Sequence, residues 1–293
     1  MATILLDQKQ KREKTEMVLL NIYNLPPIPK VMSEVLKMLD NPGISTTELT
    51  KVISKDQSLV TKILSIANSP LFGLQRKVTS IDFAILVLGF GELRNIVSVL
   101  SMVESFRNKT DKYLDHSEFW YHSFLTGTAT RRLAEEFKFP FSGEAFIAGF
   151  LHDMGVSIMH RYFHTNFITI SDLIEQGVNS SEAEATVLGM THEQIGNFLI
   201  ERWNFPLTLC DAILHHHTPG ESKNNLILSS LVHIADYMTN KLMIGNFNWD
   251  KNFVLKEEAK EALRFSNDDE FNDFVEGYRD LFTQQLESMR FLN

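Results

Sequence analysis

The sequence predicts an all-α protein, and two observations support this prediction. Apolar residues recur at helical spacing along most of the chain, and helix-capping residues stand in front of these segments. Alternating apolar and polar runs, which are typical of strands, are almost absent. We therefore expect a multi-helix bundle with an N-terminal helical lobe over residues 1–110, a second helical lobe over residues 111–245 and a C-terminal helical cap over residues 246–293.

The first lobe is predicted to contain short amphipathic helices, each with a recognisable start. These helices begin at about Pro29, Ser45, Asp56, Ser80 and Glu92. Glu48 follows Ser45 by three residues, which is the capping-box pattern, and Gly89-Phe90-Gly91 separates the last two helices. The polar stretch over residues 107–112 comes next and predicts the boundary between the two lobes.

The second lobe is predicted to contain a series of helices that carries all the candidate ligands. They lie at about residues 116–137, 143–162, 164–176, 181–188, 191–203, 206–217 and 224–242. Beyond them, the segment from Asp250 to Asn293 holds eleven acidic and six basic residues around an apolar spine that includes Phe271 and Phe274. This pattern predicts helices that cover the lobe with one face and present a solvated acidic face.

Length and charge narrow the classes of function. At 293 residues the chain is long enough to bury a sizeable core. The formal net charge of −9 argues against nonspecific binding to nucleic acid or to an anionic membrane, and favours proteins or small molecules as partners. Charged residues interrupt the most apolar run, near residues 81–100, so no membrane span is expected. The single cysteine, Cys210, cannot form an internal disulfide, and we expect a cytoplasmic protein.

The pair His152-Asp153 is the most informative feature of the chain. An adjacent imidazole and carboxylate can ligate one divalent metal ion if other ligands converge on them. Neighbours on a helix point about 100° apart, so both reach one site only from a helix end, or when the carboxylate bridges two ions. Gly155 indicates such a helix end. Upstream, Glu118 and His122 lie four residues apart and can share one helix face.

Further candidate ligands follow downstream. His192 is predicted to open a helix, with Thr191 as its N-cap. His216 and His217 stand where the next helix ends, and helix ends leave side chains free to converge. Asp236 lies on a mostly apolar helix, where a lone carboxylate is costly unless it is paired or bound to metal. The remaining histidines near these segments are interpreted as ordinary core or surface residues, and they are His116, His160, His164 and His233.

The set of imidazole and carboxylate donors, without a thiolate, favours one or two divalent ions of Fe, Mn, Ni, Co or Zn. Two ions that share a bridging aspartate can activate water for attack on a phosphoester. Any one of these histidines or aspartates alone is more often a capped, paired or exposed residue. The metal hypothesis therefore depends on the whole set.

The order of these ligands resembles that of the HD superfamily of metal-dependent phosphohydrolases, whose members are all-α. Further motifs are similar to the HDOD family, the HD-related output domain of bacterial signalling proteins. These motifs span residues 25–29, 53–59, 64–70, 84–89, 149–155 and 193–206. The resemblance covers about residues 20–240 and implies an HD-domain-like helical bundle in a signalling or regulatory protein.

The same resemblance implies a specific set of metal ligands. One ion would be held by His122, His152, Asp153 and Asp236. Asp153 would bridge to a second ion, and the other ligands of that ion would be His192, His216 and His217. Many HDOD regions have lost HD catalytic residues, whereas this sequence retains the HD ligands.

The related HD-GYP family, which hydrolyses cyclic di-GMP, provides a contrast. In that family a lysine follows the His-Asp pair by three positions, and this sequence has Val156 there. Residues 218–222 also lack the Gly-Tyr-Pro element. Both differences put hydrolysis of a cyclic dinucleotide in doubt and leave metal binding intact. Glu118 matches a position that supplies an additional ligand in some HD-GYP members.

Three functions remain open from the sequence. The first is a regulatory HDOD module that binds metal and acts through contacts with signalling proteins. The second is a metal-dependent phosphohydrolase of a nucleotide or another phosphoester, in which Asp153 would be the catalytic residue. The third is nucleic-acid binding, suggested by two short helices over residues 45–68 with Lys51, Lys55 and Lys62, and disfavoured by the acidic composition.

Overall fold

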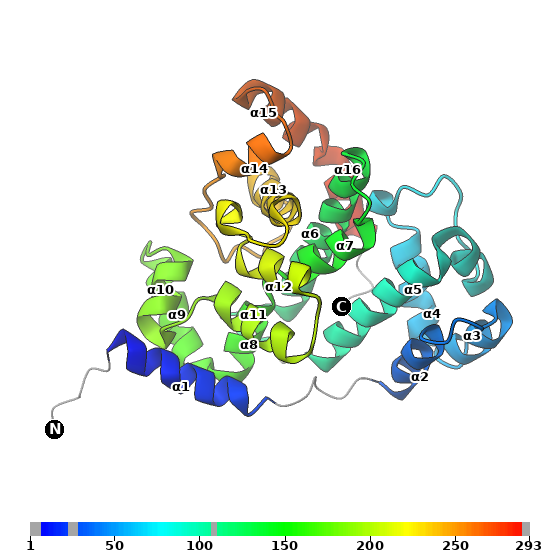
Figure 1. Cartoon of the computed structure of the whole chain (residues 1–293), viewed down its shortest axis with the longest axis horizontal. Coiled ribbons are helices and arrows are strands. Elements are labelled where there is room, and N and C mark those ends of the chain that lie inside the picture. The colour runs from blue at the N-terminus through cyan, green and yellow to red at the C-terminus, as the bar shows by residue number, and fades with distance from the viewer. Residues whose placement is uncertain (1–6, 23–28, 107–109, 289–293) are drawn as a thin grey trace.

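The computed structural model describes residues 7–22, 29–106 and 110–288, and every regular element in these ranges is helical (Figure 1). The all-α prediction is confirmed. The motif predicted over residues 25–29 falls outside the described residues except for Pro29, and so do residues 107–109 of the predicted lobe boundary.

Four of the five predicted starts in the first lobe match helix starts in the structure, and the fifth, at Glu92, lies inside α5 (Ile81–Ser105). The helices of this lobe are α2 (Lys30–Leu39), α3 (Thr46–Ile53), α4 (Gln57–Ala67), the short 3₁₀ helix η1 (Pro70–Phe72) and α5. Ser45 and Glu48 form the predicted capping box, and Asp56 caps α4 through its side chain. The predicted break at Gly89 is a kink within α5, where φ is 79° and ψ is 169°. Only glycine adopts such a conformation without strain.

The second lobe follows the predicted helices with two instructive differences. It contains α6 (His116–Glu136), α7 (Ser142–Leu151), α8 (Met154–Tyr162), α9 (His164–Glu175), α10 (Ser180–Leu188), α11 (His192–Arg202), α12 (Leu207–Leu214), the short η2 (Pro219–Glu221) and α13 (Leu226–Leu242). The segment predicted as one helix over 143–162 is broken at His152 and Asp153. The helix predicted over 206–217 ends at Leu214, so residues 215–217 lie beyond its last turn.

The helix α5 is, within the described residues, the one helix that is long and apolar enough to cross a membrane. Its most apolar 18-residue window is 39% buried inside the protein. It packs against α2, α3, α4 and α7, and its direction changes at Gly89. These contacts lead us to interpret α5 as the central helix of the first lobe.

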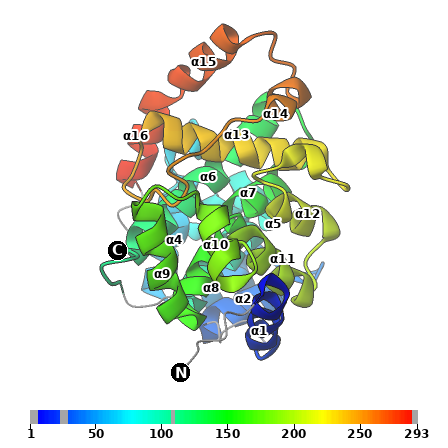
Figure 2. The same ribbon diagram turned by 90° about the vertical axis from the view of Figure 1, so that its left-hand side faces the viewer.

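The helix α1 (Gln8–Leu20) was not expected from the sequence. It lies against the end of α10 in the second lobe (Figures 1 and 2). Gln8 Nε2 and Thr15 Oγ1 each donate a hydrogen bond of 2.7 Å, to the carbonyls of Ala185 and Leu188. Leu188 is the last residue of α10, and its carbonyl has no partner within that helix, so Thr15 satisfies a group that α10 leaves open. The carbonyl of Ala185 also accepts the backbone N–H of Gly189. The boundary of the lobes at residue 110 remains a prediction.

The C-terminal segment forms α14 (Glu257–Ala262), α15 (Asp268–Gly277) and α16 (Arg279–Ser288). Figure 2 shows these helices arching over α13. The last of them contacts α6 and η1, so it touches both lobes. Phe271 and Phe282 are fully buried, as part of one hydrophobic core that continues through both lobes and this segment.

The helix pair α3 and α4 corresponds to the region with a possible nucleic-acid role. Lys55 forms an ion pair of 3.6 Å with Glu34, and Lys62 pairs with Glu104 on α5. Two of the three lysines that suggested this role therefore face carboxylates. The structure gives no support to a basic surface on this helix pair.

Candidate metal centre

The seven predicted ligands converge on one cluster inside the second lobe. They come from α6, the break between α7 and α8, the start of α11, the loop after α12, and α13. These residues are His122, His152, Asp153, His192, His216, His217 and Asp236. All except His217 are at most 7% exposed. Histidine and aspartate side chains, which are usually hydrated, thus lie in the interior, where each needs a hydrogen-bonding, ionic or metal partner.

The first half of the cluster is formed by α6, the α7–α8 break and α13. His122 Nε2 lies 3.3 Å from Asp236 Oδ1 and 3.3 Å from His152 Nε2. His152 Nε2 lies 3.3 Å from Asp153 Oδ2. Ligands bound at about 2.0–2.1 Å to one tetrahedral ion are separated by about 3.3 Å, so these spacings are those of a metal site.

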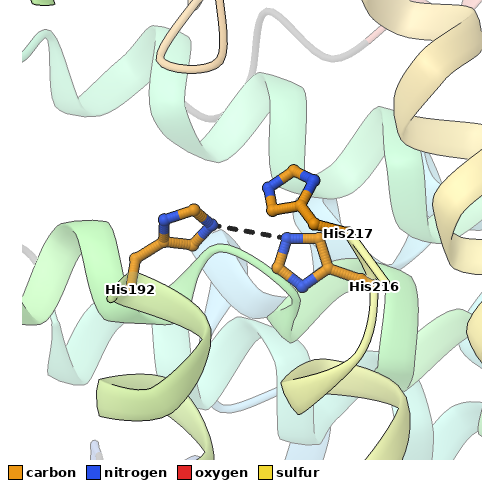
Figure 3. A group of neighbouring side chains, drawn as sticks. All are labelled: His192, His216 and His217. Carbon is orange, nitrogen blue, oxygen red and sulfur yellow. Dashed lines mark hydrogen bonds between the residues drawn. The ribbon is translucent and has the colours of Figure 1, made fainter. Parts of the chain in front are cut away.

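The second half of the cluster faces the other oxygen of Asp153. Asp153 Oδ1 lies 3.4 Å from His192 Nε2 and 3.6 Å from His216 Nε2. The two Nε2 atoms are 3.4 Å apart, and Figure 3 shows the ring of His217 beside that of His216. His217 Nε2 lies 3.2 Å from Asp250 Oδ2. One carboxylate thus stands between two groups of imidazoles, as the bridging hypothesis requires.

The outer nitrogen of each central imidazole is engaged by protein. His152 Nδ1 lies 2.8 Å from the carbonyl of Gly149, and His216 Nδ1 lies 2.7 Å from the carbonyl of Ile213. His192 Nδ1 lies 2.9 Å from Glu184 Oε1. When Nδ1 donates its proton in this way, Nε2 presents a lone pair to the cluster. This arrangement is typical of histidines that ligate metal.

The backbone explains how neighbouring residues reach one point. Leu151 ends α7 and Met154 begins α8, so His152 and Asp153 project from a helix break and not from one continuous helix. Gly155 then lets α8 approach α11 closely, because a β-carbon there would lie 2.0 Å from the carbonyl oxygen of His192. The sequence predicted a helix end at Gly155, and the structure has the helix break two residues earlier, at His152 and Asp153.

The buried carboxylates of Asp153 and Asp236 need positive charge beside them. Burial alone would lower the pKa of His152, but the carboxylates of Asp153 and Asp236 raise it to about 10. Burial, and next to it the neighbouring His217, lower the pKa of His216. Across the described residues, no lysine or arginine pairs with Asp153 or Asp236. A divalent ion would supply that charge while every histidine stays neutral.

Two buried carboxylate oxygens indicate whether the residues of the cluster suit a metal ion. Asp153 Oδ1 and Asp236 Oδ2 accept no hydrogen bond, although both side chains are almost fully buried. A buried acceptor without a partner costs about 1–3 kcal/mol, and more when it is charged. Both oxygens belong to the predicted ligand set, so metal coordination accounts for them. The residues present therefore fit a divalent ion.

Sequence reasoning missed three carboxylates that border the cluster, namely Glu184, Glu193 and Asp250. Glu184 is fully buried and accepts hydrogen bonds from the indole of Trp249 and the backbone of His192. Glu193 lies 3.6 Å from His192 Nδ1. Its place directly after His192 was the one signal available, because the other two are brought in by tertiary contacts alone.

Glu118 has a different partner. Its Oε2 accepts a hydrogen bond of 2.8 Å from the backbone N–H of Asn246, in the loop after α13. Phe247, the next residue, packs its ring 5.0 Å from that of His122. Glu118 therefore fastens a loop that packs against the cluster, and its role as an additional ligand remains a prediction.

A pocket of about 270 Å³ opens beside the second half of the cluster. His217 and Asp250 lie in its wall, together with Glu193, Lys256 and the start of α10. His217 is the exposed member of the cluster, with 19% of its side chain accessible. Of the seven proposed ligands, His217 is the one that lines this pocket.

Comparisons with known proteins agree with this fold. A family model described as HDOD domain matches residues 25–219. The chain belongs to the HDOD domain family. The family predicted from the sequence motifs is therefore confirmed. An HDOD domain protein of unknown function from Geobacter sulfurreducens superposes with a TM-score of 0.76 at 21% identity, covering 97% of this chain and 99% of that one.

Two further relatives of this HDOD chain are informative. A proposed phosphohydrolase from Shewanella amazonensis SB2B has a TM-score of 0.71 at 23% identity, covering 94% of this chain and 98% of that one. An uncharacterized protein of Treponema pallidum (strain Nichols) is 23% identical over 233 residues, which are 78% of this chain and 45% of that protein. The HDOD chain thus spans less than half the length of that relative.

Proposed function

We propose that this chain is a metal-binding regulatory protein of bacterial signal transduction, located in the cytoplasm, which acts through contacts with signalling proteins. The observation that carries the proposal is the carboxylate of Asp153. Its Oδ2 faces His152 at 3.3 Å, and its Oδ1 faces His192 at 3.4 Å. A carboxylate that bridges two ions has this placement.

In this proposal, the two ions share Asp153 and have otherwise separate ligands. His122, His152 and Asp236 would hold the first ion together with Asp153. His192, His216 and His217 would hold the second ion together with Asp153, and Asp250 stands beside His217 at 3.2 Å. Nitrogen and carboxylate donors suit divalent Fe, Mn, Ni, Co or Zn.

The surroundings of the cluster favour regulation over catalysis. Val156, at the place where HD-GYP hydrolases carry a lysine, is fully buried in the core. The pocket beside the cluster is lined by Glu193 and Asp250, with Lys256 as its basic residue. Two carboxylates and one amine thus line this pocket, an arrangement that repels a phosphate.

A metal-dependent phosphohydrolase is the second candidate, and one observation favours it. The pocket reaches His217 from solvent, so a phosphoester of modest size has a path to the cluster. The bound ions would act as Lewis acids toward the phosphoester and toward water. In that reaction Lys256 would pair with a phosphate oxygen.

Elemental analysis of metal-loaded protein tests the metal centre. We expect Asp153→Ala to bind two equivalents less of Mn²⁺ or Zn²⁺ than the wild type, because both ions lose their shared ligand. Asp172→Ala, at an exposed position of α9, is the matched control and should bind as much as the wild type. Equal metal content in wild type and Asp153→Ala would overturn the proposed centre.

Turnover separates the two functions. The loaded wild type is assayed with bis(p-nitrophenyl) phosphate and with a panel of nucleotides and cyclic nucleotides. The regulatory proposal predicts no efficient hydrolysis of any of them. Efficient turnover of a nucleotide by the wild type, lost in Asp153→Ala and kept in Asp172→Ala, would establish the phosphohydrolase instead.

A further inference from the structure

A second group of imidazoles and a carboxylate lies at the start of the second lobe and shares no residue with the centre above. Asp111 Oδ2 lies 3.0 Å from His160 Nε2 and 2.7 Å from His164 Nε2. These three ligand atoms all lie within 4.8 Å of one another. We propose that Asp111, His160 and His164 form a separate site for a divalent ion such as Zn²⁺.

The backbone places the two histidines side by side. His160 belongs to the last turn of α8 and His164 is the first residue of α9, with Phe163 between the two helices. The rings meet edge to face, with their centroids 5.1 Å apart. Both Nε2 atoms thus point toward the carboxylate of Asp111, which comes from the segment before α6.

The carboxylate of Asp111 is held in place with one oxygen free for the histidines. Its Oδ1 accepts hydrogen bonds from the backbone N–H groups of Tyr113 at 2.8 Å and Leu114 at 3.0 Å. Its Oδ2 faces the two imidazoles. Asp111 is therefore oriented as a ligand that binds through one oxygen.

The buried His116 orients His160 in turn. His116 Nε2 lies 3.1 Å from His160 Nδ1, and these two ring nitrogens share one hydrogen bond. When His160 donates its Nδ1 proton to His116, the lone pair of His160 Nε2 faces the carboxylate of Asp111. In that tautomer a bound cation would join Asp111 and His160, whereas in the other tautomer His160 Nε2 donates a hydrogen bond to Asp111. An outer partner of this kind is typical of metal-bound histidines.

The spacing and exposure suit a borderline ion with an open position. Bonds of about 2.0–2.1 Å to one ion separate the donors by about 2.9–3.4 Å for angles between roughly 90° and 109°. The 3.0 Å between Asp111 and His160 falls in this range, and His164 has to move by a few tenths of an ångström. His164 can do so because 49% of its side chain is exposed, and the same exposure lets water complete the coordination.

An ion at this site would fasten the segment before α6 to the junction of α8 and α9. His160 is 2% exposed, whereas Asp111 is 29% exposed, so the ion would sit at the surface with one buried ligand. Without an ion, the two imidazoles share Asp111 as a hydrogen-bond acceptor. The arrangement with an ion binds one more equivalent of metal than the arrangement without one, and an experiment can measure this difference.

Titration of metal-free, full-length protein with Zn²⁺, followed by calorimetry and elemental analysis, tests this site. We expect His164→Ala to bind one equivalent less than the wild type, and Asp111→Asn to lose the same equivalent. Thr165→Ala, an exposed neighbour of His164, is the matched control and should bind as much as the wild type. Circular dichroism checks that each variant is folded.

The proposed dinuclear centre is separated from this site by combining variants. His164→Ala should remove one equivalent from the wild type and also from Asp153→Ala, because the sites share no ligand. A loss of one equivalent in both backgrounds supports the surface site even if the dinuclear centre fails. Unchanged Zn²⁺ stoichiometry and affinity in both His164→Ala and Asp111→Asn would overturn it.

Discussion

A β-carbon on Gly155 would lie 2.0 Å from the carbonyl oxygen of His192, so these two residues fix how closely α8 approaches α11. His192 is a candidate ligand of one ion, and Asp153, two residues before Gly155, is the candidate bridge. The contact between two backbones thus sets the separation between ligands on two helices. A side chain at residue 155 would have to push these helices apart.

We therefore expect Gly155→Ala to destabilise the fold by ~1–3 kcal/mol, because overpacking at a rigid contact costs about this much. Urea unfolding followed by circular dichroism measures the change. Metal content should fall as well. Gly91→Ala is the control, since nothing lies within 4 Å of a β-carbon there, and it should be neutral or stabilising by roughly 0.5–1 kcal/mol. Wild-type stability and metal content in Gly155→Ala would contradict this view of the contact.

Sequence patterns predicted most of the fold because helices report locally on their own ends. Ser45 and Asp56 cap the helices that follow them, as their positions indicated. The helix α1 was not predicted, although Asp7 and Gln10 form a capping box at its start, because its apolar face is small. It buries little more than Thr15 and Leu19, and it is held by polar side chains that reach the carbonyls of α10. Nothing in residues 8–20 alone signals that partner.

The candidate site was predicted in part for the same reason. The histidines and aspartates in the HD order could be recognised from their sequence context, and the structure brings them together. Asp250 and Glu184 could not, because they lie 33 residues from His217 and eight residues from His192 and meet them only through tertiary packing. His160 and His164 were interpreted as ordinary residues, since the partner that unites them, Asp111, is 49 and 53 residues away from them.

Glu184 offers a test of the outer contacts of the centre. Its carboxylate accepts hydrogen bonds from the ring and the backbone of His192 and from the indole of Trp249. Glu184→Gln keeps the shape and removes the charge that orients His192. We expect the affinity for the ion bound by His192 to fall about 10–100-fold, because losing a group that hydrogen-bonds a metal ligand typically costs this much.

Competition with a chelator of known affinity measures this change. Glu182→Gln is the control on the same helix, because Glu182 is exposed. It should leave both affinities unchanged. An unaltered affinity in Glu184→Gln would show that the orientation of His192 is set by its backbone and not by Glu184.

Asp211 gives a prediction on acid stability. Burial alone would raise its pKa, but hydrogen bonds from the hydroxyl of Ser222 and from backbone N–H groups of residues 223–225 lower it. The folded protein therefore holds this carboxylate ionised more firmly than the unfolded chain does. Its stabilising contribution is complete above the unfolded pKa of about 4 and is lost as the pH falls through the lower pKa of the folded state.

Accordingly, Asp211→Asn should destabilise the protein by ~1–3 kcal/mol at pH 7, and this deficit should shrink as the pH falls below about 4. Urea unfolding at pH 7, 5 and 3.5 measures the deficit. Asp172→Asn, at an exposed position, is the control and should follow the wild type at each pH. A deficit of Asp211→Asn that stays constant across this range would rule out the charged form of Asp211 as the source.

Metal removal should lower the thermal stability of the wild type. The ions bind the folded chain, in which ligands from five places along the sequence converge, whereas the unfolded chain has no such site. An ion present at 100 times its dissociation constant stabilises the fold by about 2.7 kcal/mol, which corresponds to on the order of 5 °C in Tm for a chain of this size.

We expect EDTA to lower Tm by at least this amount, and Zn²⁺ or Mn²⁺ in excess over EDTA to restore it. Asp153→Ala should show a much smaller response, because its metal-free form already lacks the bridge. If EDTA leaves the wild-type Tm unchanged, or shifts Asp153→Ala equally, the buried cluster holds no ion and its histidines neutralise Asp153 and Asp236 by protonation.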